Sequence, residues 1–297
     1  MSSEAPARDA LVALAGASIA RGSRSFALAS RLFDRPTRDR AWLLYAWCRA
    51  CDDLADGQDH GFELRAVDDP AARLARLTAL TEDALAGRTT GEPAFDGLAA
   101  LMAEVAIPRA YIDEHVAGFA LDAEGWRPRT EADLIRYCDH VAGAVGCMMA
   151  VVMGVHPDDA PTLARARDLG RAFQLANIAR DVREDMAGGR CYLPQDWLDE
   201  VGLAADQLLD RPDETARLTL RLTALAERYE ASARVGARRL AFRSRWAVLA
   251  AAGIYGDIAR KVRARGADAL DRRVVTRKRA KLAWVARALW QAREAER

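Results

Sequence analysis

Hydrophobic and polar positions follow a helical pattern along almost the whole chain. Apolar residues recur three or four positions apart, and the alternating β-branched runs that are typical of strands are nearly absent. Glycine, proline and short polar clusters interrupt the pattern at intervals. We expect helices to begin or end at 34–37, 57–70, 87–93, 108, 125–128, 156–161, 188–194 and 212. The sequence therefore predicts an all-α protein.

No internal repeat and no low-complexity linker divides the 297 residues. Hydrophobic residues make up 51% of the chain, so it can bury a sizeable core. We expect one domain over residues 1–297, with frayed ends at roughly 1–12 and 285–297.

One predicted helix carries polar residues where a core is expected. In the segment QLANIARDVRED, residues 174–185, four polar side chains fall at i, i+3, i+7 and i+11 and share one stripe. The residues around the stripe are largely apolar. The stripe consists of Gln174, Asn177, Asp181 and Asp185.

A second predicted helix has a similar stripe. In LYAWCRACDDLAD, residues 44–56, the polar positions fall at i, i+4, i+7 and i+11 on a mostly apolar helix. This stripe consists of Tyr45, Arg49, Asp52 and Asp56. Two aspartates four residues apart are separated by about 6 Å of helix rise, so they can share or flank a hard cation.

The cost of burying carboxylates limits the functions that these two stripes can have. Each buried carboxylate costs several kcal/mol unless it is paired or bound to a metal, and the chain has only three lysines. Oxygen ligands from Asp and Asn suit Mg²⁺ or Mn²⁺ better than zinc. Because Mg²⁺ usually completes its shell with water and substrate phosphates, the stripes predict a site for metal and polyphosphate beside an apolar cavity.

Other interpretations of these segments are weaker. A single D-x-x-x-D pair on a helix is common and usually solvated. Two matched polar stripes are much less expected by chance. A calcium loop from Asp52 to Glu63 would place Leu54, which cannot ligate, at its third position. Cys48 and Cys51 form a C-x-x-C without a second pair, which favours buried apolar roles over a zinc or redox site.

Charge and cysteine content exclude several classes of protein. The formal net charge of +1 gives no bulk attraction to nucleic acid. No glycine-rich nucleotide motif and no H-E-x-x-H is present. An odd count of five cysteines indicates reduced thiols and a cytoplasmic location. We expect neither a signal peptide nor a membrane span, because the apolar run 141–155 is too short to cross a bilayer.

The motifs together resemble the phytoene and squalene synthase family. Five segments between Arg21 and Arg279 occur in the family's order: GSRSFALAS, LLYAWCRACDDLAD, YCDHVAGAVG, FQLANIARDVRED and GRCYLPQDWL. The sequences of these segments are most similar to those of the bacterial phytoene synthases. The resemblance implies a single all-α bundle around a deep central cavity. Ala176 replaces a threonine that is usual in the family, but this change removes no metal ligand.

The resemblance also implies roles for individual residues. The implied metal ligands are Asp52, Asp56, Asn177, Asp181 and Asp185. Tyr45 and Tyr137 join the four aspartates as implied catalytic residues. Phe26 and Tyr137 match aromatic residues of the cavity, where a π face can stabilise a carbocation, although core packing is an equal alternative. The implied substrate-binding residues are Gly22, Ser23, Arg24, Ser25, Phe26, Tyr45, Arg49, Asp53, Gln174, Arg180, Arg190 and Tyr255.

The activity that the resemblance implies is the head-to-head condensation of two geranylgeranyl diphosphates to phytoene. The expected cofactor is Mg²⁺, with Mn²⁺ as a substitute, and no NADPH is expected. One alternative is a relative that uses C15 substrates and makes presqualene diphosphate, dehydrosqualene or squalene. A terpene cyclase fits less well, because neither GSRSF nor the second stripe is typical of cyclases. A helical scaffold without Mg²⁺-dependent turnover is the non-enzyme alternative.

Several finer expectations concern partners and regions. We expect prenyl diphosphate substrates, no nucleic acid, and a monomer or weak dimer. The basic stretch 260–281 could bring the chain to the surface of the inner membrane, although solvated helix faces explain most of it. The segment 186–193 is expected to close over the diphosphate, with Arg190 reaching inward; an ordinary connection is the alternative.

Substrate length is the least determined feature. Small residues at Ala142, Gly143, Ala144 and Gly146 could leave room at the cavity floor for a C20 chain. The same residues equally permit close helix packing, so the preference for C20 rests mainly on the resemblance.

Overall fold

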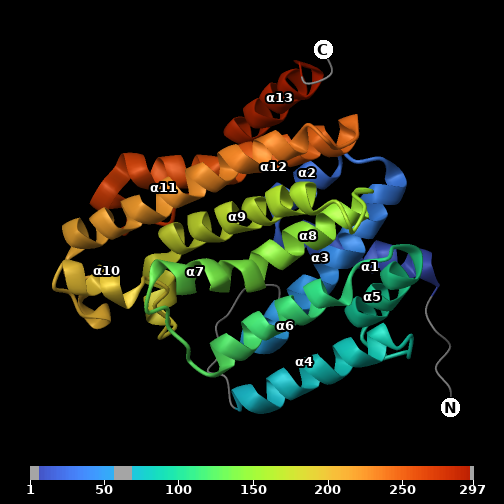
Figure 1. Ribbon diagram of the computed structural model, residues 1–297, viewed down its shortest axis with the longest axis horizontal. Helices are drawn as coiled ribbons and strands as arrows, with labels where there is room; N and C mark the ends of the chain where they lie inside the picture. The colour runs from blue at the N-terminus through green and yellow to red at the C-terminus, as the bar shows by residue number, and fades with distance from the viewer. Residues whose placement is uncertain (1–6, 57–68, 295–297) are drawn as a thin grey trace.

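The computed structural model describes residues 7–56 and 69–294, and this part of the chain is helical with no strand (Figure 1). The elements in chain order are α1 (Arg8–Gly22), α2 (Arg24–Ser30), α3 (Arg35–Asp56), α4 (Pro70–Leu85), α5 (Pro93–Glu104), α6 (Arg109–Ala123), α7 (Glu131–Cys138), η1 (Asp139–Gly143), α8 (Ala144–Val152), α9 (Ala160–Ala187), α10 (Gln195–Glu200), η2 (Ala205–Gln207), α11 (Pro212–Ala237), α12 (Phe242–Arg265), η3 (Gly266–Ala269) and α13 (Lys278–Glu294). The predicted all-α class is confirmed.

Helix boundaries follow the predicted breakers closely. The Asp159 side chain accepts a hydrogen bond from the Thr162 amide at the start of α9, and Thr130 forms a capping box at the start of α7. Residues 57–68, which carry most of one predicted boundary and of the calcium-loop alternative, lie outside the described residues. The ends are helical further out than expected, because α1 begins at Arg8 and α13 continues to Glu294. The single-domain organisation stays a prediction.

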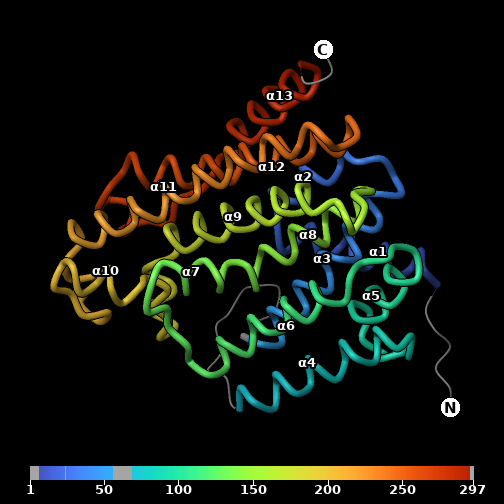
Figure 2. The backbone as a smooth tube through the Cα atoms, viewed as in Figure 1, coloured from blue at the N-terminus to red at the C-terminus, as the bar shows by residue number. Residues whose placement is uncertain are grey.

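Helix α9 is the central element of the bundle. It packs against α11, α12, α8 and η1, and the views show it running between α8 and α12 (Figures 1 and 2). Its buried residues include Leu175, Ile178 and Ala179, which belong to the core formed with α7, α11 and α12. Helix α3 packs against α1, α5 and α8 and belongs to a second core cluster. The two polar stripes therefore lie on helices from different core clusters.

Helices α7 and α8 are joined through η1, a π-helical turn at Asp139–Gly143. Figure 2 shows the three as one continuous path beside α9. By length and composition alone, Glu131–Val152 could cross a membrane, and half of its most apolar window is buried inside the structure.

Close packing of η1 and α8 on α9 depends on glycine. A Cβ on Gly170 would lie 2.1 Å from the carbonyl oxygen of Ala142, and one on Gly146 would lie 2.3 Å from that of Ala166. Both neighbours are backbone atoms, which cannot move away without shifting a helix. At these two positions the small residues serve close helix packing.

We expect Gly170→Ala to destabilise the protein by about 1–3 kcal/mol, because the added methyl group forces η1 away from α9. Gly97→Ala is the matched control, since its Cβ would meet only the flexible end of the Leu43 side chain at 3.2 Å. Urea unfolding measures both variants. Equal stability of Gly170→Ala and the unmodified protein would show that the helices can separate at no cost.

Candidate functional site

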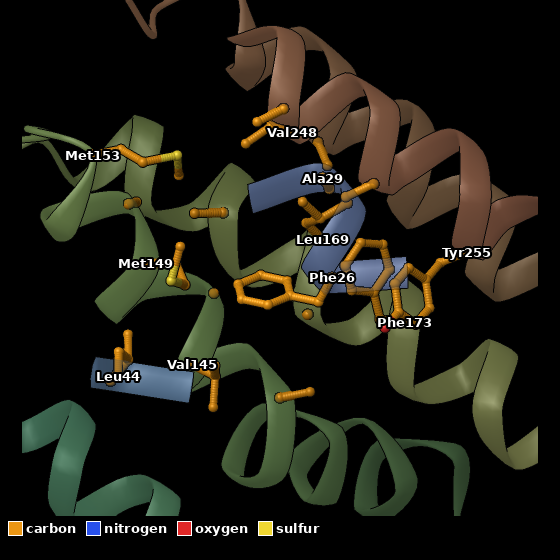
Figure 3. Close-up of a pocket in the computed structure, with 18 of the residues that line it drawn as sticks. Phe26, Ala29, Leu44, Val145, Met149, Met153, Leu169, Phe173, Val248 and Tyr255 are labelled. Atoms are coloured by element: carbon orange, nitrogen blue, oxygen red, sulfur yellow. The ribbon is translucent and has the colours of Figure 1, made fainter. Parts of the chain in front are cut away.

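An apolar cavity lies among α2, α3, α6, η1, α8, α9, α11 and α12. Figure 3 shows its wall, where Phe26 from α2 lies beside Leu169 and Phe173 from α9. Met149 and Met153 lie on the opposite side of the view from Tyr255. The wall is almost wholly apolar apart from a few residues. The polar or titratable side chains of the lining are Tyr45, Cys48, Asp52, His115, Thr162, Arg165 and Tyr255.

Two stacked aromatic pairs mark one end of the cavity. The rings of Phe26 and Tyr45 are 5.3 Å apart, and those of Phe173 and Tyr255 are 4.2 Å apart. Figure 3 shows Phe173 and Tyr255 side by side. Burial raises the pKa of the Tyr45 phenol, so it stays neutral and can donate a hydrogen bond. Gly22 is needed beside it, because a Cβ there would lie 2.7 Å from the Tyr45 hydroxyl.

The first polar stripe, on α3, lies at the end of the cavity that the two aromatic pairs mark. Asp52 lines the cavity and lies 3.5 Å from a guanidinium nitrogen of Arg49. The same guanidinium donates to Asp53 at 2.8 and 3.0 Å. Asp56 is the last residue of α3, and its side chain lies outside what the structure describes. In this state Arg49 therefore neutralises two neighbouring carboxylates that a cation would otherwise balance.

The second polar stripe lies in the C-terminal part of α9, where the helix is kinked. Asp181 has non-helical dihedral angles of φ −102° and ψ 17°. Its carboxylate accepts hydrogen bonds from Arg180 at 2.6 Å and from Arg273 at 2.8 and 3.1 Å. Burial alone would raise the pKa of Asp181, but these hydrogen bonds outweigh it, and the pKa lies below its usual value. Asp181 is therefore a carboxylate between two guanidinium groups.

Asp185 and Asn177 have the properties of ligands for a cation. Burial, followed by the charge of Asp181, raises the pKa of Asp185 to about 7. The Asn177 side-chain oxygen is buried and has no hydrogen-bond partner in the described structure. A buried acceptor without a donor is costly, and an oxygen-binding cation would satisfy it. Within 7–56 and 69–294, no three His, Cys, Asp or Glu residues are gathered closely enough to hold a metal.

The other predicted substrate-binding residues are distributed around this end. Ser23 caps α2, and its hydroxyl accepts a hydrogen bond from the Phe26 amide. Ser25 lies partly buried on α2, and Gln174 lies partly buried on α9. The side chain of Arg24 lies outside the described structure.

Tyr137 lies in the core cluster around α7, α9 and α11, and its implied catalytic role stays a prediction. It is absent from the cavity wall, its ring stacks on Trp126 and Tyr192, and its hydroxyl donates to Asp122 at 3.0 Å. Tyr192 donates to the other oxygen of the same carboxylate at 3.1 Å. Packing in the neighbouring core, which was the alternative for this residue, therefore describes its position better than a role in lining the cavity.

The connection after α9 is tied to its surroundings. Helix α9 ends at Ala187, and Gly189 takes the left-handed conformation with φ 74°, as the paired glycines predict. The Arg190 amide then donates to the Asp185 carbonyl at 2.8 Å. Two residues on, Tyr192 bonds to Asp122. Arg190 is thereby placed next to Asp185.

Arg273 is a site residue that the stripes do not predict. It lies after η3, 92 residues from Asp181 in sequence, and its guanidinium still meets that carboxylate. The only signal was its place in the basic stretch 260–281, which we interpreted as a solvated or membrane-facing surface. A charge on an irregular segment has no periodicity from which its direction can be predicted.

Comparison with known proteins agrees with this geometry. The model of the squalene/phytoene synthase family matches residues 19–280. The chain belongs to the squalene/phytoene synthase family. It is 46% identical to a phytoene synthase of Pseudescherichia vulneris over 274 residues, covering 89% of this chain and 86% of that protein. It is also 46% identical to a 15-cis-phytoene synthase of a Paracoccus strain over 272 residues, covering 92% and 88%.

Solved structures of the squalene/phytoene synthase family share the fold. A dehydrosqualene synthase crystallised with a ligand superimposes with a TM-score of 0.84 at 25% identity, covering 97% of this chain and 98% of that one. A squalene synthase from Alicyclobacillus acidocaldarius has a TM-score of 0.76 at 22% identity, covering 87% and 95%. The latter likeness shows the fold alone.

We expect divalent cations to bind the substrate-free protein more weakly as the pH falls below about 7, because a proton then occupies Asp185. One competing proton weakens binding about tenfold for each pH unit. Calorimetric titration with Mn²⁺ in buffers of different ionisation enthalpy should detect close to one released proton at pH 6 and almost none at pH 8. Asp185→Asn should abolish this release. Proton release that is the same at both pH values would contradict the assignment.

The same pKa shift predicts the sign of the stability change. The folded protein holds this proton more tightly than the unfolded chain, whose Asp pKa is about 3.8. The stabilising contribution is complete below about pH 4 and is lost as the pH rises through about 7. Asp185→Asn should therefore raise the melting temperature at pH 8 in the absence of metal.

Proposed function

We propose that this chain condenses two geranylgeranyl diphosphates head to head into phytoene, through the cyclopropylcarbinyl intermediate prephytoene diphosphate. This reaction is the first committed step of carotenoid biosynthesis. The observation that carries the proposal is an apolar cavity with acidic and aromatic residues at one end, in a chain 44–46% identical to several phytoene synthases. An apolar prenyl chain fits the wall, and a diphosphate fits the polar end.

The residues at the polar end suit a divalent cation, which we propose to be Mg²⁺, with Mn²⁺ as a substitute. Asp52, Asp56, Asn177, Asp181 and Asp185 would hold it, and the buried, unpartnered oxygen of Asn177 supports the fit. When bound, the cation neutralises the diphosphate and so favours loss of this leaving group.

The arginines of this site would exchange partners when substrate arrives. Arg49 now balances Asp52 and Asp53, and Arg180 and Arg273 balance Asp181. If the carboxylates held a cation, these guanidinium groups would be able to donate to phosphate oxygens. The site thus stays close to neutral in both states, which lowers the cost of burying its charges.

Ionisation of the first diphosphate leaves an allylic cation in the cavity. The aromatic faces of Phe26, Tyr45, Phe173 and Tyr255 can stabilise it, and the apolar wall excludes water that would quench it. The C2–C3 alkene of the second substrate attacks this cation, and proton loss closes a cyclopropane. A second ionisation rearranges the ring to the 1–1′ link, and a further proton loss forms the central double bond. No hydride donor is required, so NADPH is not expected.

We propose that the connection after α9 covers the diphosphate end of the cavity, with Arg190 reaching the phosphates. Its contact with Asp185 and the anchoring of Tyr192 by Asp122 support an ordered cover more than a loose lid. We further propose a cytoplasmic monomer or weak dimer that touches the inner-membrane surface to release product. Leu282 and Trp290, which are 51% and 60% exposed on the basic helix α13, support such a contact.

The direct test is a competition between equal amounts of C15 and C20 diphosphates with Mg²⁺ and without NADPH. Mass spectrometry should find a C40 hydrocarbon as the main product. A dominant C30 product would support the second candidate function, condensation of C15 substrates, which the similarity to a dehydrosqualene synthase favours. Absence of any Mg²⁺-dependent product would support the non-enzyme alternative, a helical scaffold.

We expect Asp52→Asn and Asp181→Asn each to lower turnover by about 10²-fold or more while the fold is kept, because each removes a charge that ionisation requires. Asp199→Asn, an exposed change on α10, is the matched control. Steady-state rates at saturating Mg²⁺ measure the effect, and circular dichroism verifies the fold. Near-normal rates in both variants would disprove the metal assignment.

We expect Ala142→Phe to shift preference from C20 toward C15 substrates, since Ala142 lines the cavity and a phenyl ring would shorten it. Ala144 is not suited to the same test, because it is buried away from the cavity wall. The ratio of C30 to C40 product is the readout, because general destabilisation lowers both products together. An unchanged ratio would mean that other wall residues limit chain length.

A further inference from the structure

The segment between η3 and α13 brings a guanidinium group to the polar end of the site. We call this segment, residues 270–277, the strap. Arg273 lies in its middle and donates to the Asp181 carboxylate at 2.8 and 3.1 Å. No amide of residues 271–277 donates to another backbone group among the described residues, so the strap has no ladder of its own to fix its path. Its position must come from contacts with other elements.

The side chains of the strap alternate between the interior and the surface. Val274 and Thr276 are buried, whereas Arg273 and Val275 are exposed. This alternation is typical of an extended chain, in which neighbouring side chains point to opposite faces. A slip of one residue would exchange the two sets and move the guanidinium away from Asp181. The position of Arg273 therefore depends on the register of the strap.

The buried residues of the strap hold this register. Val274 packs into the core formed with α7, α9, α11 and α12. The Thr276 hydroxyl lies 2.9 Å from a carboxylate oxygen of Asp257 and 3.1 Å from the Ile254 carbonyl oxygen. Both oxygens are acceptors on α12, so the hydroxyl proton binds the strap to that helix in either case.

Asp257 and Lys261 form the fixed side of this contact. They lie one turn apart on α12, and Lys261 Nζ is 2.6 Å from the same carboxylate oxygen that meets Thr276. This ammonium also donates to the Val275 carbonyl at 3.3 Å. One ion pair on α12 thus binds both a side chain and a backbone group of the strap.

The beginning of the strap is tied to α9, the helix that carries Asp181. Arg183, two residues further along α9, donates through Nε to the Leu270 carbonyl at 2.6 Å. Arg273 therefore lies between two tethers, one to α9 before it and one to α12 after it.

Fastening α13 to the bundle does not require the hydroxyl of Thr276. Trp284 packs so closely on Gly253 that a Cβ there would lie 2.4 Å from its ring. The indole nitrogen of Trp246 donates to the Val285 carbonyl at 2.9 Å. These contacts join α13 to α12 directly, so the polar contact of Thr276 serves the strap more than the helix that follows it.

We propose that Thr276 is a positioning residue that, together with Asp257, sets the register of the strap and so directs Arg273 toward the diphosphate. The inference rests on the proposed function, in which Arg273 donates to phosphate oxygens. Because the strap is held at its backbone, only the guanidinium has to move from Asp181 to phosphate. A side chain on a fixed backbone loses less conformational freedom on binding than one on a loose segment.

The test is a double-mutant cycle in which calorimetry measures the binding of inorganic diphosphate at saturating Mg²⁺. Arg273→Gln should weaken binding about 10- to 100-fold, because it removes a charged donor. Thr276→Val should weaken it about three- to tenfold, because Arg273 loses its fixed register. In the Arg273→Gln background, Thr276→Val should have no further effect, since it acts through Arg273.

Further variants separate positioning from stability. Thr276→Ser keeps the hydroxyl and should restore most of the binding. Thr90→Val is the matched control, because Thr90 also donates its hydroxyl to a helical carboxylate, that of Asp96 on α5, at 2.8 Å. It should lower the melting temperature much as Thr276→Val does and leave diphosphate binding unchanged. Lys261→Met supplies the same cycle from the α12 side if Thr276→Val does not fold.

The remaining outcomes separate this inference from the proposed function. Equal losses from Thr276→Val with and without Arg273 would show that the hydroxyl acts on stability alone and would overturn the inference. Unchanged diphosphate binding in Thr276→Val would overturn it as well. If the cycle is as expected but the unmodified protein forms no phytoene, the proposed function is refuted and the positioning role stands.

Discussion

The pairing of buried carboxylates with positive charge is the constraint on which this structure depends. Helix α9 carries Asp181 and Asp185 into a mostly apolar interior, where a carboxylate without a counter-charge is costly, whereas the Asp52 side chain on α3 is 43% exposed. Arg49 supplies the positive counter-charge on α3. Arg180 and Arg273 supply it for Asp181 on α9. Asp185 meets mainly burial and a like charge, and its pKa rises to about 7. Such an arrangement suits a site that exchanges guanidinium groups for a cation when substrate binds.

The rest of the bundle gives these charges a rigid and apolar frame. Helix α9 supplies cavity wall in its first half and polar ligands in its second, so one element joins the prenyl chain to the diphosphate. Gly170 and Gly146 let η1 and α8 approach its backbone closely. The kink at Asp181 falls within the charged region, beyond Phe173, the last residue of α9 in the cavity wall. A small movement of this helix would therefore alter both the cavity and the charge balance.

Helical periodicity made much of the fold predictable. Boundaries at proline and glycine agree with the structure because these residues act locally, through their own dihedral angles and missing donors. The turn at 238–241 between α11 and α12 was not predicted, since it contains neither residue and follows from the packing of the two helices. Tyr137 shows the same limit within the site, because its hydroxyl is directed by Asp122 and Tyr192 from other elements.

The sequence by itself determined that the protein is helical and that two helices carry matched polar stripes, because both properties repeat within a few residues of the chain. The motifs in their order also determined the family. Tertiary structure alone decided which guanidinium groups hold Asp181, that Asn177 keeps a buried oxygen without a partner, and that Thr276 meets Asp257. These features join residues far apart in sequence, and no local pattern records the direction in which a distant side chain will point.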